Sequence, residues 1–370
     1  MPLMRSTLLV ALMVVTSNLA SQRIHSQENS SVGFKSGTET SASDVSDTGA
    51  DKTTEQKPNS ATERKAVVGK EKPERTPPQK PEPLNGANFI DDAQITRYAE
   101  YQVNRLIKGG DAQTCNDLAS QLVDTTVPIS LIAPGKRKRG AAQLYRQASK
   151  SVVAILISRK HLDHWHIVLA ATGFFVSDDG VVATNHHVFK QSDEYMFAMT
   201  SDFAVHPIRQ VLGGDAASDV AFCRIESDAY RGLPLNKDAA IGSEVALISH
   251  PAGRYFFLSR GIVARRYVRP PQRRSSRSDE DSREESQTPR QSSRWLTITA
   301  EFGKGSSGGP VFDRYGNVVG MATSTNSLRV GEKNEQVAQM NFRDCVPAVV
   351  MLESLNEKLS GSKSNPTSTE

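Results

Sequence analysis

The feature that most constrains the fold is a series of short segments rich in β-branched and aromatic residues, beginning at residue 152. Turn-forming residues separate these segments, and no long helical pattern lies between them. Such a series is typical of an all-β domain rather than of alternating helices and strands. The predicted strands are residues 152–157, 166–176, 181–184, 195–199, 207–212, 220–225, 245–248, 257–265, 295–299, 311–312 and 318–322.

A glycine-rich stretch, Gly-Ser-Ser-Gly-Gly-Pro at residues 305–310, lies between two of these predicted strands. Glycine adopts positive φ angles and lets another chain approach the backbone closely. A serine on such a turn can project its hydroxyl, while the N–H groups of Gly305 and Ser307 converge on one point, as an oxyanion hole requires. Gly-Ser stretches are also typical of flexible linkers, but the strand-like flanks favour a buried turn.

A serine hydroxyl needs an oriented base to act as a nucleophile, and the sequence offers two histidines and two acids. His186 and His187 follow the predicted strand 181–184, and the residues alone do not choose between them. Asp219 directly precedes an apolar strand. Asp215 lies in a glycine-rich turn, where aspartate commonly stabilises the turn itself, so Asp219 is the preferred acid.

Three blocks in the order His, Asp, Ser resemble the catalytic blocks of trypsin-like serine proteases, most closely the bacterial HtrA/Deg-like branch. They are Thr-Asn-His-His-Val at 184–188, Ser-Asp-Val-Ala at 218–221 and the stretch 305–310. The resemblance implies His187 as base, Asp219 as its orienting acid and Ser307 as nucleophile. It also implies Gly305 and Ser307 as the oxyanion hole.

The same resemblance covers residues 144–359 and implies an all-β, chymotrypsin-like fold. Two six-stranded barrels would carry the site between them, and a helix at 346–359 would close the domain. The implied activity is that of a serine endopeptidase that hydrolyses proteins or peptides through an acyl-enzyme intermediate, without a cofactor.

The sequence departs from its relatives at three places. Ser306 stands where the digestive enzymes carry an aspartate that pairs with a freed N-terminus, so that form of activation is not expected. Deg-type enzymes usually continue into a PDZ domain, whereas little more than one helix follows Met351, and no PDZ domain is expected. A long polar insertion occupies residues 269–294. A tolerated disordered insertion is preferred over a substrate-recruiting or autocleavable loop.

Substrate preference depends on two positions that the resemblance places near the primary specificity pocket. Ala322 aligns where glutamyl-specific relatives carry a histidine, which disfavours acidic substrates. Glu301 lies six residues before Ser307. An inward Glu301 would favour basic side chains, and an outward one small or medium apolar side chains. The outward arrangement is preferred.

The N-terminal part of the chain predicts export. Residues 1–22 resemble a signal peptide, with Arg5 before the apolar run 8–15, which indicates a periplasmic or secreted protein. Residues 23–87 are rich in Ser, Thr, Pro, Lys and Glu and predict a disordered linker. It would act as a spacer rather than as a tether to a wall.

A short helical pre-domain segment is expected over residues 88–140, before the protease domain at 141–359 and a disordered tail at 360–370. One helix is predicted at 91–107 from its apolar spacing, and a second after a capping Asp111. The basic run 136–139 is expected to be a solvated or clipped linker rather than a site for nucleic acid or lipid.

Composition excludes several other classes. The net charge of +4 over 370 residues is too small and too spread out to indicate a nucleic-acid partner. The eight-residue apolar run is too short for a stable membrane anchor. Three cysteines without close spacing argue against a disulfide framework or a zinc site. Cys223 is expected to be buried, and a bridge between Cys115 and Cys345 remains open.

A group of three histidines, His161, His164 and His166, suggests a metal site. Asp163 is the one carboxylate near them at ligand spacing. A solvated hairpin tip is therefore the preferred interpretation, with no metal. Two other functions remain as alternatives to the enzyme: a catalytically silent binding module with the protease fold, and an envelope scaffold. Because no member of the His-Asp-Ser set is missing, the enzyme is favoured.

Overall fold

The structure is a computed structural model that describes residues 77–227, 231–270, 293–331 and 337–357, all within one compact unit of the chain. Four predicted segments lie outside the described residues, wholly or for the most part. They are the signal peptide at 1–22, the linker up to residue 76, the insertion over 271–292 and the C-terminal tail.

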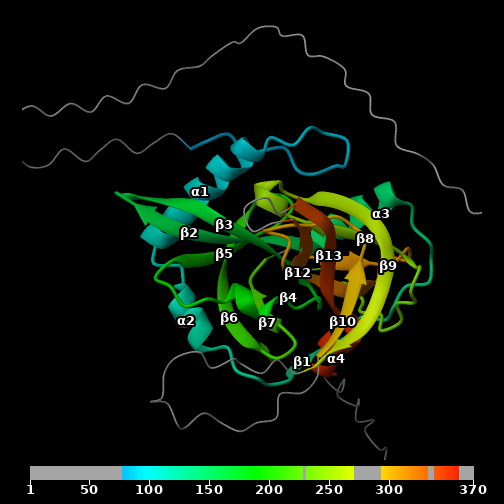
Figure 1. Ribbon diagram of the computed structural model, residues 1–370. Coiled ribbons are helices and arrows are strands. Elements are labelled where there is room, and N and C mark those ends of the chain that lie inside the picture. Colours follow the sequence, from blue (N-terminus) through cyan, green and yellow to red (C-terminus); the bar gives the residue numbers. More distant parts are fainter. Residues whose placement is uncertain (1–76, 228–230, 271–292, 332–336, 358–370) are drawn as a thin grey trace, which may run out of the picture. The chain divides into compact units, whose positions relative to one another are not determined.

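Six antiparallel strands close the first barrel, in the order β2-β3-β4-β7-β6-β5 (Figure 1, green). Their bounds are Val152–His161 (β2), His164–Phe175 (β3), Val181–Thr184 (β4), Tyr195–Met199 (β5), Val205–Asp215 (β6) and Val220–Ile225 (β7). Alternating burial along β6 matches a strand with one face in the core and one outside. All six strands were predicted from the sequence, three of them with the same bounds.

Six further strands close the second barrel, in the order β10-β13-β12-β11-β8-β9 (Figure 1, yellow to red). Their bounds are Glu244–Ser249 (β8), Phe257–Arg269 (β9), Ser293–Ile298 (β10), Pro310–Phe312 (β11), Val318–Val330 (β12) and Val337–Pro347 (β13). The predicted all-β fold with two six-stranded barrels is therefore confirmed. The strand β13 and the second half of β12 were not predicted, because their exposed residues carry little apolar alternation.

Within the described residues from 77 on, three helices precede the first barrel. The helix α1 (Asp92–Lys108) begins at Asp91, whose carboxylate accepts from the Gln94 N–H. The predicted cap of the second helix was wrong. The helix α2 (Cys115–Ser120) is capped by Thr114 in a reciprocal capping box with Asp117, while Asp111 pairs with Arg209. A third helix, α3 (Ala141–Ala148), was not predicted and buries Leu144 and Ala148.

The predicted C-terminal helix is present but is shorter than expected. The helix α4 spans Ala348–Glu353, and the preceding Val346 and Pro347 belong to β13. After α4, the strand β14 (Leu355–Glu357) pairs in parallel with β1 (Val127–Ile129). This pairing joins the end of the described chain to the segment before the first barrel, and it stops the helix because Leu355 must be extended to pair.

Part of the predicted linker contacts the folded body. Within the described residues 77–87, Pro81 is buried and Leu84 packs against the largest hydrophobic cluster. We therefore expect a deletion that extends to residue 87 to lower stability more than one that ends at residue 76.

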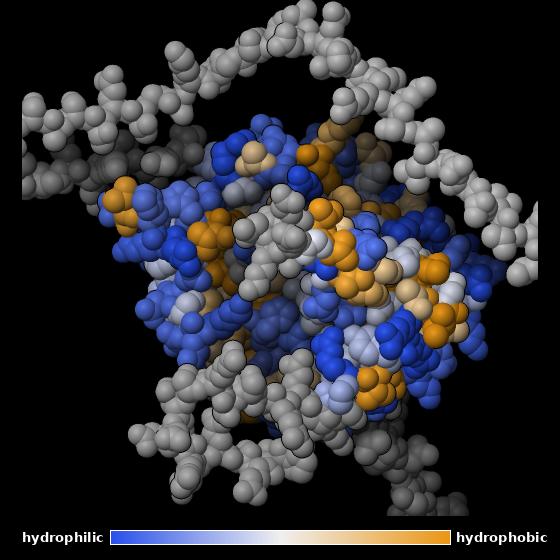
Figure 2. Space-filling model, in the orientation of Figure 1, coloured by the Kyte–Doolittle hydropathy of each residue, from blue (hydrophilic) through white to orange (hydrophobic). Residues whose placement is uncertain are grey.

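The exterior is mainly polar, with scattered apolar residues. Figure 2 shows more hydrophobic residues over the second barrel than over the first on the visible face. Strands β12 and β13 carry exposed apolar residues at Leu328, Val330, Val337 and Met340. Across the described part of the chain, none of the helices combines the length and the apolar character needed to cross a membrane.

All three cysteines are free and buried. Cys115 and Cys223 lie in the core of the first barrel and Cys345 in that of the second, so the bridge between Cys115 and Cys345 is not formed. Burial raises the pKa of Cys223 to about 12, which disfavours its reactive thiolate.

We expect none of the three thiols to react rapidly with a soluble disulfide reagent in the native protein. All three should react once the chain is unfolded in denaturant, because burial is what protects them. Spectroscopic titration of thiols in both states checks this. A thiol count of one instead of three in the unfolded, unreduced protein would show that two cysteines do pair.

Candidate active site

His187 and Asp219 meet where strand β4 ends and the neighbouring strand β7 of the first barrel begins. Strands β4 and β7 pair with Thr184 opposite Ala221, which brings the residues after β4 close to those before β7. His187 lies in a short 3₁₀ turn, His186–Val188. Its Nδ1 atom lies 2.9 Å from Asp219 Oδ2, and its backbone N–H donates to Asp219 Oδ1 at 3.0 Å. The acid therefore fixes both the backbone and the ring of His187.

Asp219 occupies this place through an unusual backbone conformation. Its φ is 59°, in the left-handed region that few residues other than glycine, asparagine and aspartate adopt. The side chain of Asp215 is used differently. Its Oδ1 accepts from the N–H groups of Ala217 and Ser218, as a turn-forming aspartate does. The structure brings Asp219, not Asp215, to His187.

Ser307 lies in a turn that only glycines permit. Gly305 and Gly308 have φ angles of 95° and 86°. A Cβ atom on Gly308 would stand 1.9 Å from the backbone oxygen of Thr172 in β3. The same strand binds the turn directly, because the Thr172 N–H donates to Ser307 O at 2.8 Å. The first barrel therefore fixes the turn that the second barrel carries.

A buried asparagine connects the two halves of the candidate site. The amide of Asn185 donates to Asp219 O at 3.0 Å and to Thr323 Oγ1 at 2.9 Å. Ser307 Oγ in turn donates to the backbone oxygen of Thr323 at 3.2 Å. Sequence reasoning did not single out Asn185 or Thr323. The one signal was the polar Asn185 at the end of an apolar strand, next to the two histidines.

Two N–H groups of the turn are available to a ligand. Within the part of the chain that is described, neither Gly305 nor Ser307 donates its backbone N–H to a protein acceptor, whereas Ser306, Gly308 and Gly309 do. The orientation of Gly305 is set from both sides. Its carbonyl accepts from Thr172 Oγ1 at 2.9 Å, and the preceding Lys304 carbonyl accepts from the Ala252 N–H at 2.7 Å.

The neighbouring serine has a different environment. Ser306 is completely buried, and Ser249 Oγ donates to its Oγ at 3.0 Å. Its hydroxyl is thus satisfied inside the second barrel and cannot meet a substrate. The position where digestive relatives carry an aspartate is filled here by a neutral hydrogen-bonded pair of serines.

The two candidate specificity residues differ in exposure. Ala322 is completely buried, and its backbone N–H and oxygen bind Gly309 and Gly308 of the serine turn at 2.8 Å each. The side chain of Glu301 is 73% exposed and forms an ion pair with Arg343. Of the two arrangements that the sequence left open for Glu301, this is the outward one.

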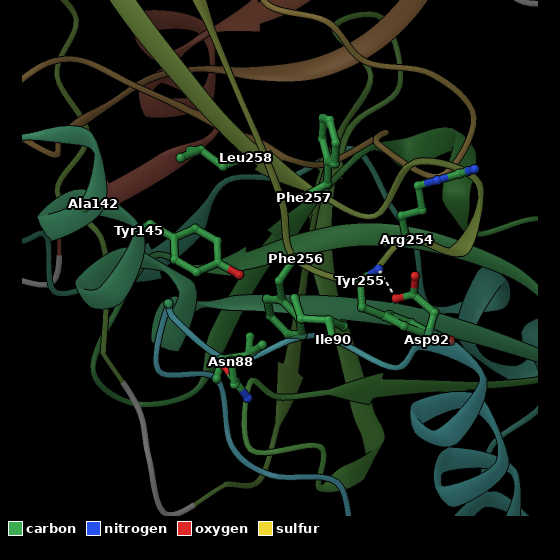
Figure 3. Close-up of a pocket in the computed structure, with 12 residues that line it drawn as sticks. Asn88, Ile90, Asp92, Ala142, Tyr145, Arg254, Tyr255, Phe256, Phe257 and Leu258 are labelled. Carbon is green, nitrogen blue, oxygen red and sulfur yellow. Dashed lines mark hydrogen bonds between the residues drawn. The ribbon is translucent and has the colours of Figure 1, made fainter.

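A separate hollow lies on another part of the molecule. It has a volume of about 590 Å³ and is lined mainly by apolar and aromatic side chains, among them Leu84, Ile90 and Phe256. Figure 3 shows the Tyr145 hydroxyl directed into it. His187, Asp219 and Ser307 do not line this hollow, so it is not part of the candidate active site.

His250 is a buried histidine beside the serine turn. Its ring Nδ1 accepts from the Phe256 N–H at 3.0 Å, and its backbone N–H donates to Thr172 Oγ1 at 3.2 Å. Complete burial lowers the pKa of His250 from 6.5 to about 3. Between these two pH values the unfolded chain binds a proton at this residue that the folded chain does not bind. The free energy of unfolding must therefore decrease as the pH falls.

Because of His250, we expect the free energy of unfolding to decrease by about 1.4 kcal/mol for each pH unit between pH 6.5 and about 3. His250→Asn keeps an acceptor near the Phe256 N–H but has no titrating group, so its stability should depend less on pH. Urea unfolding of both proteins at neutral and mildly acid pH measures the difference. Equal slopes for wild type and His250→Asn would contradict the assignment.

Comparison with known proteins shows which families and proteins this chain is similar to. Residues 171–321 match the trypsin-like peptidase domain family. A probable periplasmic serine endoprotease, DegP-like, of Brucella suis is 27% identical over 165 residues, which cover 44% of this chain and 28% of that protein. An uncharacterized protein, y4bJ, of Sinorhizobium fredii is 28% identical over 155 residues, 42% of this chain and 22% of that one.

The chain thus matches about a quarter of the length of these curated relatives. Among solved structures, the crystal structure of the serine endoprotease from Yersinia pestis is similar with a TM-score of 0.42 and 18% identity. The match covers 59% of this chain and 66% of that one. The predicted resemblance to trypsin-like serine proteases of the HtrA/Deg-like branch is confirmed by the domain match and the DegP-like relatives.

Proposed function

We propose that this protein is a serine endopeptidase in which His187, Asp219 and Ser307 form the catalytic triad. The observation that carries the proposal is the contact of 2.9 Å between His187 Nδ1 and Asp219. Asn185 and Thr323 connect this pair to the Ser307 turn, in which the N–H groups of Gly305 and Ser307 have no protein acceptor among the described residues. This is the arrangement that nucleophilic catalysis by serine requires.

The first half-reaction transfers an acyl group to the enzyme. With Nδ1–H donated to Asp219, His187 keeps Nε2 as an acceptor for the Ser307 proton. The hydroxyl turns from the Thr323 carbonyl toward His187, and Ser307 Oγ attacks the substrate carbonyl carbon. The N–H groups of Gly305 and Ser307 stabilise the negative oxygen. The peptide C–N bond then breaks, and His187 gives its proton to the leaving amine.

The second half-reaction restores the enzyme. Water enters in place of the amine, His187 removes one of its protons, and the hydroxide oxygen attacks the ester carbonyl. The bond between the acyl carbon and Ser307 Oγ breaks, and the proton returns from His187 to the serine. Asp219 stabilises the imidazolium in both halves without taking the proton itself.

The hydrogen bond from Ser307 to Thr323, rather than to His187, is compatible with this mechanism. Catalytic hydrogen bonds are often long or misaligned without substrate and tighten only when substrate binds. The Asn185 bridge supports the same assignment, because it holds Thr323 and Asp219 at a fixed distance from each other.

Protein or peptide substrates with small or medium apolar residues before the cleaved bond fit the site best. The exposed Glu301 carboxylate is already paired with Arg343, so it offers little to a basic substrate side chain. The DegP-like relatives are named periplasmic, and we propose that this chain is likewise exported. No cofactor takes part in the proposed mechanism.

Incubation of the purified protein with casein and with a fluorophosphonate probe tests the proposal. We expect casein to be cleaved, and prior treatment with the probe to abolish the cleavage. A folded protein that neither cleaves casein nor small peptide esters nor takes up the probe would instead be a silent binding module or a scaffold.

A further inference from the structure

The helix α1 lies along the part of strand β3 that has no strand neighbour on one side. Strand β3 pairs with β2 along its length, but on its other side it pairs with β4 only at Phe174 and Phe175. Side chains of α1 satisfy the backbone at the beginning of β3. Asn104 accepts from the Trp165 N–H at 3.0 Å and donates to Trp165 O at 2.8 Å. One turn earlier, Glu100 Oε1 accepts from the Ile167 N–H at 3.1 Å.

These contacts place a carboxylate beside two histidines. His164 and His166 are two residues apart on β3 and therefore share one face of the strand. Their rings lie 4.9 Å apart in a T-shaped arrangement. Glu100 Oε1 lies 3.5 Å from His166 Nδ1. The candidate ligand atoms of Glu100, His164 and His166 all lie within 4.8 Å of one another.

We propose that Glu100, His164 and His166 form a binding site for a divalent transition-metal ion of the zinc class. Two imidazole nitrogens and one carboxylate oxygen are ligands that zinc prefers, at about 2.0–2.2 Å. Tetrahedral coordination at that length separates ligand atoms by about 3.4 Å, which matches the distance between Glu100 and His166. The third ligand, His164, is half-buried, and its Nε2 lies 3.4 Å from Asn104 Nδ2 of the same helix.

Three protein ligands leave a fourth position for water. His161 is the nearest further histidine, with its ring centroid 6.2 Å from that of His166. From the sequence, the histidine group was interpreted as a solvated hairpin tip without a metal, because Asp163 was the one carboxylate near it at ligand spacing. Glu100 supplies a carboxylate from a helix more than sixty residues earlier, and only the fold brings the two segments together.

Further contacts hold the proposed ligands in place. Asn104 clamps the backbone of Trp165, which lies between the two histidines, and Glu100 is held by the Ile167 N–H. Such outer contacts orient metal ligands and raise affinity. A bound ion would connect α1 to β3, so the metal would stabilise the segment before the protease barrels. The two histidines lie at the beginning of β3, whereas the Ser307 turn contacts Thr172 near its end. The ion has no part in the proposed hydrolysis.

Titration of the full chain with zinc chloride tests the site. The chain should carry Ser307→Ala to prevent self-cleavage, and binding is measured by calorimetry at neutral pH. We expect one zinc ion per chain and a melting temperature that rises by several degrees in its presence. His164→Gln, His166→Gln and Glu100→Gln should each weaken binding at least about tenfold and remove the rise. Gln at residue 100 still accepts from the Ile167 N–H, so the fold is kept.

Two matched controls separate this site from other histidines. His206→Gln, on β6, should leave zinc binding unchanged. His187→Gln should also leave it unchanged, although it removes the base of the proposed triad. The proposal is overturned if the chain binds no zinc. It is equally overturned if His187→Gln abolishes binding while His164→Gln and His166→Gln do not.

Discussion

Ser307→Ala is expected to reduce peptide hydrolysis by about a million-fold and to abolish covalent labelling by a fluorophosphonate. The physical reason is that the substitution removes the only atom that the proposed mechanism joins to the substrate. Loss of a triad nucleophile typically leaves the residual catalysis of binding and of the oxyanion hole. Initial rates on a peptide ester and on casein measure the effect.

Ser306→Ala is the matched control, because it removes the same atom from the adjacent residue. It deletes the hydrogen bond to Ser249 in the core of the second barrel, at a cost of about 1–3 kcal/mol in the free energy of unfolding. Most of the activity should remain below the melting temperature. If Ser306→Ala were inactive and Ser307→Ala active, the nucleophile would be misassigned.

The second large effect is expected at the other two positions of the proposed triad, His187 and Asp219. His187→Ala removes the base, and Asp219→Asn leaves an amide that favours the wrong tautomer of His187. The latter substitution should lower kcat by about ten-thousand-fold, by analogy with the serine protease triad. The folded structure should be preserved, because Asn also tolerates the left-handed conformation of residue 219.

Asp215→Asn is the control for the acid. Asp215 accepts two N–H groups within its own turn and does not contact His187, and an asparagine oxygen can accept the same bonds. We therefore expect nearly wild-type kcat for this variant. Steady-state kinetics of the wild type, His187→Ala, Asp219→Asn and Asp215→Asn tests the assignment of the acid. If Asp215→Asn were inactive and Asp219→Asn active, Asp215 would be the acid of the triad.

Much of the fold could be predicted because local pattern and tertiary structure agree in the first barrel. Strands β4, β5 and β7 are short apolar segments between turn residues, and their predicted bounds match the structure. The second half of β12 and all of β13 were missed for the opposite reason. These strands pair with each other over ten positions, yet many of their side chains face solvent. Backbone pairing, together with polar side-chain contacts such as that of Asn326 with Asp344, holds the exposed part of these strands, and such contacts leave no apolar alternation in the sequence.

In the candidate site, too, some residues could be predicted from the sequence and others could not. Sequence blocks singled out His187, Asp219 and Ser307, because each lies in a short motif of residue types with few other uses. The contacts that position them are made by Asn185 and Thr323, which are unremarkable in sequence. Their roles depend on a distance between two barrels, so spacing along the chain could not reveal them.

The proposed mechanism depends most directly on the identity of one reactive atom, Ser307 Oγ. Treatment of the wild-type protein with a fluorophosphonate, followed by tryptic digestion, should give one modified peptide, residues 305–314, between Lys304 and Arg314. Both Ser306 and Ser307 lie in this peptide, so fragmentation in the mass spectrometer assigns the adduct. We expect it on Ser307, and its yield should fall to background in His187→Ala. An adduct on Ser306, or labelling that is equally strong without His187, would contradict the proposed mechanism.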